Sequence, residues 1–106
     1  MEEFLQRQLD LLNSFICEYK DGILPLNLFI QRMEGIVAAV DSAEFRDSTF
    51  PILLSMEQIN ADAIDNSRKL TDSEKDIINK SMVELEQLGD AASRNRAFFK
   101  SQATRQ

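Results

Sequence analysis

Apolar side chains recur every three or four positions along most of the chain, which is the period of an α-helix. Within residues 2–20 this stripe consists of Phe4, Leu5, Leu9, Leu12, Phe15, Ile16 and Tyr19. Gly22 lies two residues beyond this segment. Glycine favours the left-handed conformation that ends many helices, because it has no side chain to clash with the backbone. The pattern therefore predicts a first helix over residues 2–20.

The same period predicts a second and a third helix. The second begins with Pro25, which suits a first helical turn, and ends near residue 41. Its stripe contains Leu26, Phe29, Ile30, Met33, Ile36, Val37 and Val40. The third has a first turn at Pro51 and ends near Asn66, and its candidate N-caps are Asp47, Ser48 and Thr49. Its stripe reads Ile52, Leu53, Met56, Ile59, Ala63 and Ile64. Residues 42–50 fit either a loop or a short helical turn.

A capping box predicts the start of the fourth helix. In Thr71-Asp72-Ser73-Glu74 the Thr hydroxyl and the Glu carboxylate can satisfy each other's free backbone N–H groups. The stripe that follows contains Ile77, Ile78, Leu85, Leu88 and Ala92. The helical pattern extends toward Phe98 and Phe99, so this helix is expected to be the longest, with a break at Gly89 left open.

Four amphipathic segments joined by short connections predict an all-α protein, an antiparallel up-down four-helix bundle with a long C-terminal helix. The chain has 106 residues, of which 43% are hydrophobic and 28% charged, so it is expected to form one domain over residues 1–100 with a flexible tail over 101–106. Residues expected to be buried together are Phe15, Phe29, Met33, Met56, Ile59, Leu85 and Leu88.

The composition excludes most kinds of catalytic site. The chain has no histidine, which removes Ser-His and Cys-His nucleophile pairs and the common zinc and iron sites. Cys17 is the one cysteine, so neither an internal disulfide nor a cysteine-built zinc site can form. It lies off the apolar stripe without a basic cluster to activate it, and we interpret it as an exposed, unreactive thiol. We expect a protein that is not an enzyme and needs no cofactor.

The N-terminus carries acidic residues where a signal peptide needs basic ones. No apolar run approaches the roughly 18 residues of a membrane span. We therefore expect a cytoplasmic protein with no membrane partner.

Charge is distributed unevenly along the chain. The net charge is −6, but residues 1–66 hold 12 acidic against four basic residues, whereas residues 67–106 hold six against eight. This acidic field argues against nucleic acid and favours a basic protein partner. The candidate partner-binding residues are the acids off the core stripes or in the connection between the second and third helices, namely Glu34, Asp41, Glu44, Asp47, Glu57, Asp62 and Asp65.

These polar and aromatic residues allow two other interpretations. The acidic side chains would also form an ordinary solvated face that keeps the protein soluble. Phe98 and Phe99, near Arg94, Arg96 and Lys100, fit nucleic-acid contacts, but we favour closure of the bundle end or a homodimer contact.

Two segments resemble a known family. Residues 15–33, FICEYKDGILPLNLFIQRM, are similar to the opening of colicin-D-type immunity proteins and related contact-dependent-inhibition immunity proteins. Residues 70–74, LTDSE, resemble the start of a later acidic helix in that family. Together they make up less than a third of the chain. The resemblance implies a small acidic bundle that binds the toxic nuclease domain of a bacterial competition protein and blocks its cationic active site.

A second class of function remains open from the residues alone. A non-catalytic adaptor, a homodimer or a chaperone-like module would use an apolar groove where an inhibitor would use its acidic face. Ionic strength separates the two classes, because an electrostatically steered complex weakens as salt is added.

Overall fold

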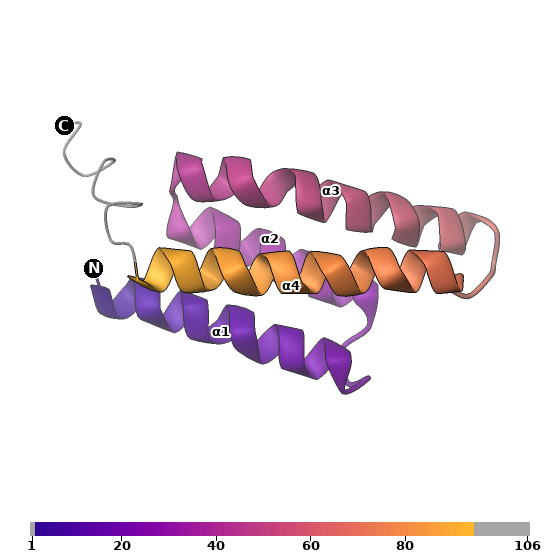
Figure 1. Ribbon diagram of the computed structural model, residues 1–106, viewed down its shortest axis with the longest axis horizontal. Helices are drawn as coiled ribbons and strands as arrows, with labels where there is room; N and C mark the ends of the chain where they lie inside the picture. Colours follow the sequence, from indigo (N-terminus) through magenta and orange to yellow (C-terminus); the bar gives the residue numbers. More distant parts are fainter. Residues whose placement is uncertain (1, 95–106) are drawn as a thin grey trace.

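Four helices form an antiparallel up-down bundle, as the sequence predicts. The computed structural model describes residues 2–94, which comprise α1 (Glu2–Lys20), α2 (Leu26–Val40), α3 (Ala43–Asp65) and α4 (Asp72–Arg94). Successive helices run side by side in opposite directions, and α4 returns along α1 to close the bundle (Figure 1). The predicted tail over 101–106 and the extension of the last helix to Phe98 and Phe99 lie outside the described residues. Within 2–94 no helix has the length and apolarity that a bilayer crossing requires.

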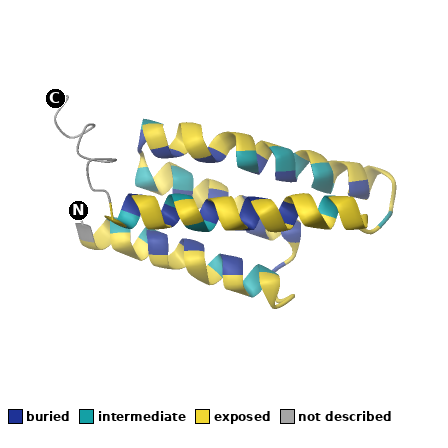
Figure 2. Cartoon of the chain, viewed as in Figure 1, coloured by how far each residue is buried: buried dark blue, intermediate teal, exposed yellow. Residues whose placement is uncertain are grey.

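The core is built from apolar side chains of all four helices, with buried positions turned inward along each of them (Figure 2). Phe29, Met33, Met56 and Leu85 are at most 1% exposed. The other three predicted core residues are partly buried and pack against this cluster, namely Phe15, Ile59 and Leu88. The predicted core is therefore confirmed, with three of its members at the edge.

Three predicted stripe residues are exposed, and the first of them, Phe4 of α1, is 42% exposed. The other two lie on α3 and α4. Ile64 is 63% exposed and Ile77 is 44% exposed. Each is adjacent to a residue that takes the inward position, Ala63 beside Ile64 and Ile78 beside Ile77. Consecutive residues of a helix lie about 100° apart around its axis, and at these two places the neighbour takes the inward position. The prediction that Phe4, Ile64 and Ile77 face inward is wrong.

The start of α3 also differs from the prediction. The helix begins at Ala43, and Ser42 is its N-cap, with the Ser42 hydroxyl accepting a hydrogen bond from Phe45 N at 3.2 Å. Pro51 lies inside the helix and not in its first turn. Residues 43–50 are helical because they continue the core stripe, with Phe45 and Thr49 fully buried. Burial of Phe45 outweighs the backbone hydrogen bond that Pro51 cannot donate.

The ends of α1 and α3 share one geometry. Gly22 has a φ of 79°, its N–H donates to Tyr19 O at 3.0 Å, and Ile23 N donates to Glu18 O at 2.9 Å. This Schellman arrangement confirms the predicted glycine cap. Ser67, with a φ of 50°, takes the same position after α3. Pro25 is the N-cap of α2, one position before the predicted first turn.

Gly89 does not interrupt α4, which continues to Arg94. A Cβ at Gly89 would lie 3.3 Å from Leu12 Cδ2, closer than comfortable packing allows. The missing side chain thus permits α1 to approach α4 closely at this point.

The predicted capping box forms at the start of α4. Thr71 Oγ1 accepts from Glu74 N at 3.1 Å, and Glu74 Oε1 accepts from Thr71 N at 2.9 Å. Arg68 donates to both carboxylate oxygens of Glu74, at 2.8 and 2.9 Å, and also to Asp62. Arg68 and Thr71 together lower the pKa of Glu74 to about 2. This network joins the end of α3 to the start of α4.

Substitution of two phenylalanines tests whether α3 begins at Ala43, upstream of Pro51. Phe45 is 0% exposed and Phe50 is 59% exposed. Phe45→Ala should lower the free energy of unfolding by about 3–5 kcal/mol, because a cavity replaces the ring. Phe50→Ala should change it by no more than about 0.5 kcal/mol. Urea denaturation measures both, and equally small effects would contradict a core position for Phe45.

The Arg68–Glu74 contact predicts a defined pH dependence. The pKa of Glu74 is about 2 in the folded protein against an ordinary 4.5. Its contribution to stability is therefore fully present above pH 4.5 and lost as the pH falls toward 2. Glu74→Gln should destabilise the protein at pH 7, and the difference from the unmodified protein should shrink at pH 3.

Thr71→Ala is the control for Glu74→Gln. It should lower the free energy of unfolding by about 1 kcal/mol at both pH values, because it removes an N-cap that carries no charge. Denaturation of all three proteins at both pH values measures these differences. A Glu74→Gln effect of the same size at both pH values would contradict the assigned pKa.

Candidate functional site

Three of the seven candidate acids line one groove between α2 and α3. This groove has a volume of about 420 Å³. Its acidic members are Glu34 from α2 and Glu57 and Asp65 from α3. The remaining lining residues are polar or apolar, namely Asn27, Ile30, Gln31, Asn60, Ala61 and Ile64. We refer to it as the α2–α3 groove.

The other four candidates lie elsewhere. Asp41 is the C-cap of α2, and Glu44 lies in the first turn of α3, where a negative charge stabilises the helix dipole. Asp47 precedes Asp65 by 18 positions on the same helix, a separation of about 27 Å along the axis. Asp62 accepts hydrogen bonds from Arg68 and from Asn66. The seven residues therefore do not form one continuous surface.

Glu34 and Glu57 are in contact across the α2–α3 groove. The hydrogen bond from Glu57 raises the pKa of Glu34, with smaller contributions from partial burial and from repulsion between the two charges. Two carboxyl groups can share a hydrogen bond only when one of them holds a proton. Nothing in the sequence pattern links these residues, because their proximity depends on how α2 and α3 are rotated against each other.

No lysine or arginine is among the residues that line the α2–α3 groove. The guanidinium of Arg32, also on α2, lies over the ring of Phe15 at 5.8 Å. Arg68 is engaged by Asp62 and Glu74. Arg46 precedes Glu57 by 11 positions on α3, about 16 Å along the axis. The groove thus concentrates negative charge that no lining residue neutralises.

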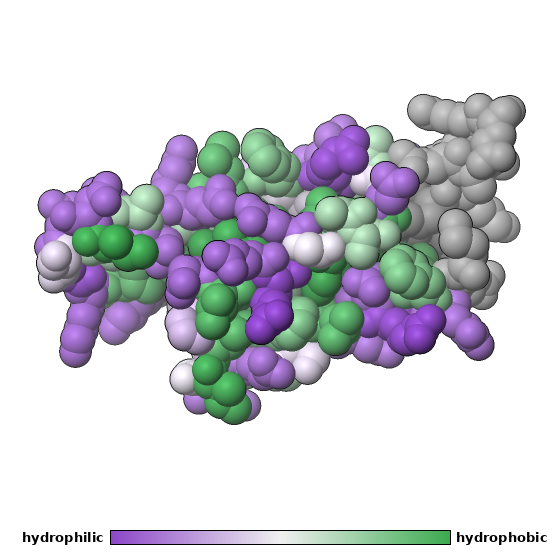
Figure 3. Space-filling model, turned by 180° about the vertical axis from the view of Figure 1, so that it is seen from behind, coloured by the Kyte–Doolittle hydropathy of each residue, from purple (hydrophilic) through white to green (hydrophobic). Residues whose placement is uncertain are grey.

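Apolar side chains extend beside this groove along the outer face of α3. Phe50 is 59% exposed, Leu54 is 40% exposed and Ile64 is 63% exposed. On the rear face of the molecule, where α2 lies, apolar patches alternate with strongly polar ones (Figure 3). An exposed surface that combines large apolar side chains with charge is typical of protein-binding sites.

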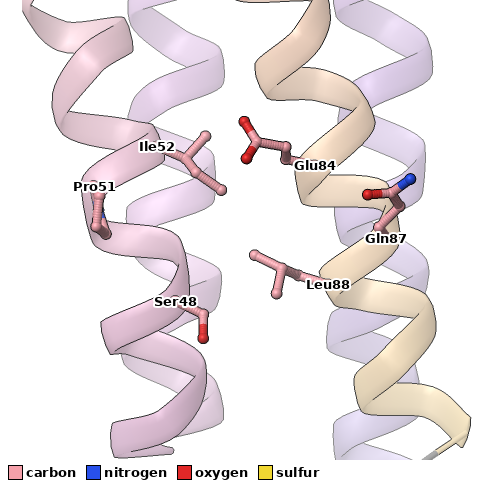
Figure 4. Close-up of a pocket in the computed structure, with 6 residues that line it drawn as sticks. All are labelled: Ser48, Pro51, Ile52, Glu84, Gln87 and Leu88. Carbon is pink, nitrogen blue, oxygen red and sulfur yellow. The ribbon is translucent and has the colours of Figure 1, made fainter.

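A second groove lies between α3 and α4. It has two adjoining parts of about 350 and 330 Å³, which share Pro51, Ile52 and Glu84. Ile52 of α3 and Leu88 and Glu84 of α4 point into the gap between the two helices (Figure 4). This groove contains none of the seven candidates, and its charged residues are one cation, Lys80, and one anion, Glu84. The α3–α4 groove therefore carries both signs of charge, whereas the charged residues of the α2–α3 groove are all acidic.

The described part of the chain holds no group of three or more His, Cys, Asp or Glu side chains placed to bind a metal ion. Cys17 is exposed, as the sequence predicts. The chain matches no protein family model, no curated protein and no solved structure.

The contact between Glu34 and Glu57 should be measurable as a change in the pKa of Glu34 when Glu57 is replaced. Glu57→Gln should bring the pKa of Glu34 down toward its ordinary value, because the amide removes the repulsion and donates a hydrogen bond to the Glu34 carboxylate. Side-chain carbon NMR shifts followed through a pH titration report this pKa. Glu84→Gln, the same replacement in the α3–α4 groove, should leave the Glu34 titration unchanged. An unchanged Glu34 pKa in Glu57→Gln would show that the two carboxyls do not interact.

Proposed function

We propose that this protein is a non-catalytic inhibitor of the immunity type, which binds a basic nuclease toxin and covers its cationic active site. The observation that carries the proposal is the α2–α3 groove, in which Glu34, Glu57 and Asp65 gather without a lysine or arginine among the lining residues. A nuclease surface that binds phosphates presents lysine and arginine side chains. Carboxylates held in a groove would occupy those side chains in place of phosphates.

The overall charge supports the same partner. Residues 1–66 carry eight more acidic than basic residues, so the field of this part of the protein attracts a basic surface. Such a field accelerates association, while the carboxylates at the interface determine how long the complex lasts. The proposal places the protein in the cytoplasm, in keeping with the sequence expectation.

A second candidate function follows from the α3–α4 groove. Its apolar residues Pro51, Ile52 and Leu88 would suit an adaptor or a homodimer that buries an apolar face. Lys80 and Glu84 would then pair with opposite charges of the partner. A complex of this kind would depend little on ionic strength, whereas the inhibitor complex would weaken steeply with salt.

Charge reversal in the α2–α3 groove tests the proposal. Glu34→Lys combined with Asp65→Lys should slow association with the product of the gene directly upstream and weaken the complex, most strongly at low salt. The loss should be roughly 2–5 kcal/mol for each desolvated pair that is broken. Pull-down followed by surface plasmon resonance at several salt concentrations measures both effects. Asp62 is left unchanged because it holds Arg68.

The matched control is Glu3→Lys combined with Asp10→Lys on α1, which changes the net charge equally at two exposed positions. It should reduce the association rate slightly and leave the dissociation rate unchanged. Full affinity in the groove variant would contradict the proposal. A salt-independent complex with a partner that is not a nuclease would favour the second candidate function.

A further inference from the structure

Exposed residues on the outer face of α3 follow a heptad pattern. Phe50, Leu54, Ala61 and Ile64 occupy the first, second, fourth and fifth of five positions spaced four, three, four and three residues apart. This spacing is that of the a and d positions on which another helix packs. The middle position is Glu57, which contacts Glu34. An apolar stripe on α3 is thus interrupted at its centre by a carboxyl group.

The stripe has the dimensions of a helix-binding site. From Phe50 to Ile64 it extends about 21 Å, which corresponds to four helical turns. On α2, Asn27, Gln31 and Glu34 repeat the spacing of four and three residues and line the opposite side of the groove. The α2–α3 groove beside the stripe therefore has two walls, one on each helix, that repeat the same spacing.

We propose that the α2–α3 groove and the α3 stripe receive one amphipathic helix of the partner, whose apolar heptad stripe is interrupted by a single arginine that binds between Glu34 and Glu57. This inference deepens the proposed function, on which it rests for the identity of the partner as a basic protein. The feature of that protein which the groove recognises is the helix with its single arginine.

Charge selects this occupant over the alternatives. A leucine opposite Glu57 would bury a carboxylate without a partner, which is costly. A guanidinium carries several donors in one plane and can bridge two carboxylates, whereas the lysine ammonium is a single point charge. A second copy of this chain would place Glu34, Glu57 and Asp65 opposite like charges. Arginine at one defined position would also set the register of the docked helix.

Docking should oppose the rise in the pKa of Glu34. Contact with Glu57 raises the pKa of Glu34, and the only other charged residue that lines the groove is Asp65. Arg32 and Arg68 are engaged by Phe15 and by carboxylates, and Arg46 is about 16 Å away along α3. A bound guanidinium stabilises both carboxylates in their charged form. Affinity for the helix should therefore rise as the pH increases above the ordinary glutamate pKa.

Three synthetic helical peptides of about 21 residues test the inference. Each carries leucine at its a and d positions, and the central position is arginine, its uncharged analogue citrulline, or leucine. Binding to the full chain is measured by fluorescence anisotropy, at concentrations where sedimentation shows the peptides to be monomeric. The arginine peptide should bind about tenfold more tightly than the citrulline peptide. Its advantage should decrease at pH 4.

Variants of the protein assign the effect to the groove. Glu57→Leu should reverse the preference, so that the leucine peptide binds more tightly than the arginine peptide. Glu34→Gln, at an exposed position, should reduce the arginine preference without affecting the fold, as checked by circular dichroism. Glu84→Gln in the α3–α4 groove is the matched control and should retain the full preference.

Equal binding of the three peptides, or a preference that Glu57→Leu and Glu34→Gln leave intact, would overturn the inference. Loss of the preference in Glu84→Gln alone would place the docking site in the other groove and would also overturn it. These outcomes leave the proposed function standing if the upstream nuclease still binds. Conversely, an arginine preference in a protein that binds no nuclease would support the docking site and reject the proposed function.

Discussion

Each helix of this bundle can turn only one face toward the core, and that constraint determines what remains on the surface. The inward positions are occupied by large side chains such as Phe29, Phe45 and Met56, which are fully buried. Burying a side chain of this size contributes roughly 1.5–3 kcal/mol, so these residues set the rotation of each helix. Ile64 and Glu57 then lie outside the core because Ala63 and Met56 occupy the inward positions next to them. The candidate site is thus a consequence of core packing.

The length of α3 has the same origin. Ser42 caps the helix and Phe45 anchors its first turns, so the helix continues through Pro51 to Asp65. A helix that began at Pro51 would exclude Phe50 from the outer stripe and shorten the surface beside α2. The early start therefore gives α3 a continuous face, with apolar residues on both sides of Glu57. A partner helix of about four turns could contact this face along its whole length.

Local signals in the sequence were sufficient for much of the fold. The spacing of the apolar residues indicates four helices. Gly22 and Thr71 correctly mark a helix end and a helix start, because capping depends on residues only a few positions apart. The start of α3 differs from the prediction because Phe45 continues the core stripe upstream of Pro51, so the proline lies inside the helix and not in its first turn. Ile64 is exposed because its neighbour Ala63 takes the inward position on α3.

The candidate site was less accessible to sequence reasoning. The acids were correctly identified as lying off the core stripes, but their grouping depends on contacts between helices. Asp62 pairs with Arg68 after the chain turns, and Glu34 meets Glu57 only when α2 packs on α3. Asp62 and Asp65 lie three residues apart on one helix, whereas the structure brings Asp65 together with Glu34 and Glu57 in the α2–α3 groove.

We propose that a basic partner docks on the α2–α3 groove. Methyl NMR of the isoleucine side chains tests it most directly, because Ile64 lines that groove, whereas Ile52 and Ile77 line the groove between α3 and α4. Addition of the captured partner should shift or broaden the Ile64 methyl signal and leave those of Ile52 and Ile77 in place. Changes at Ile52 and Ile77 with an unperturbed Ile64 would contradict the account.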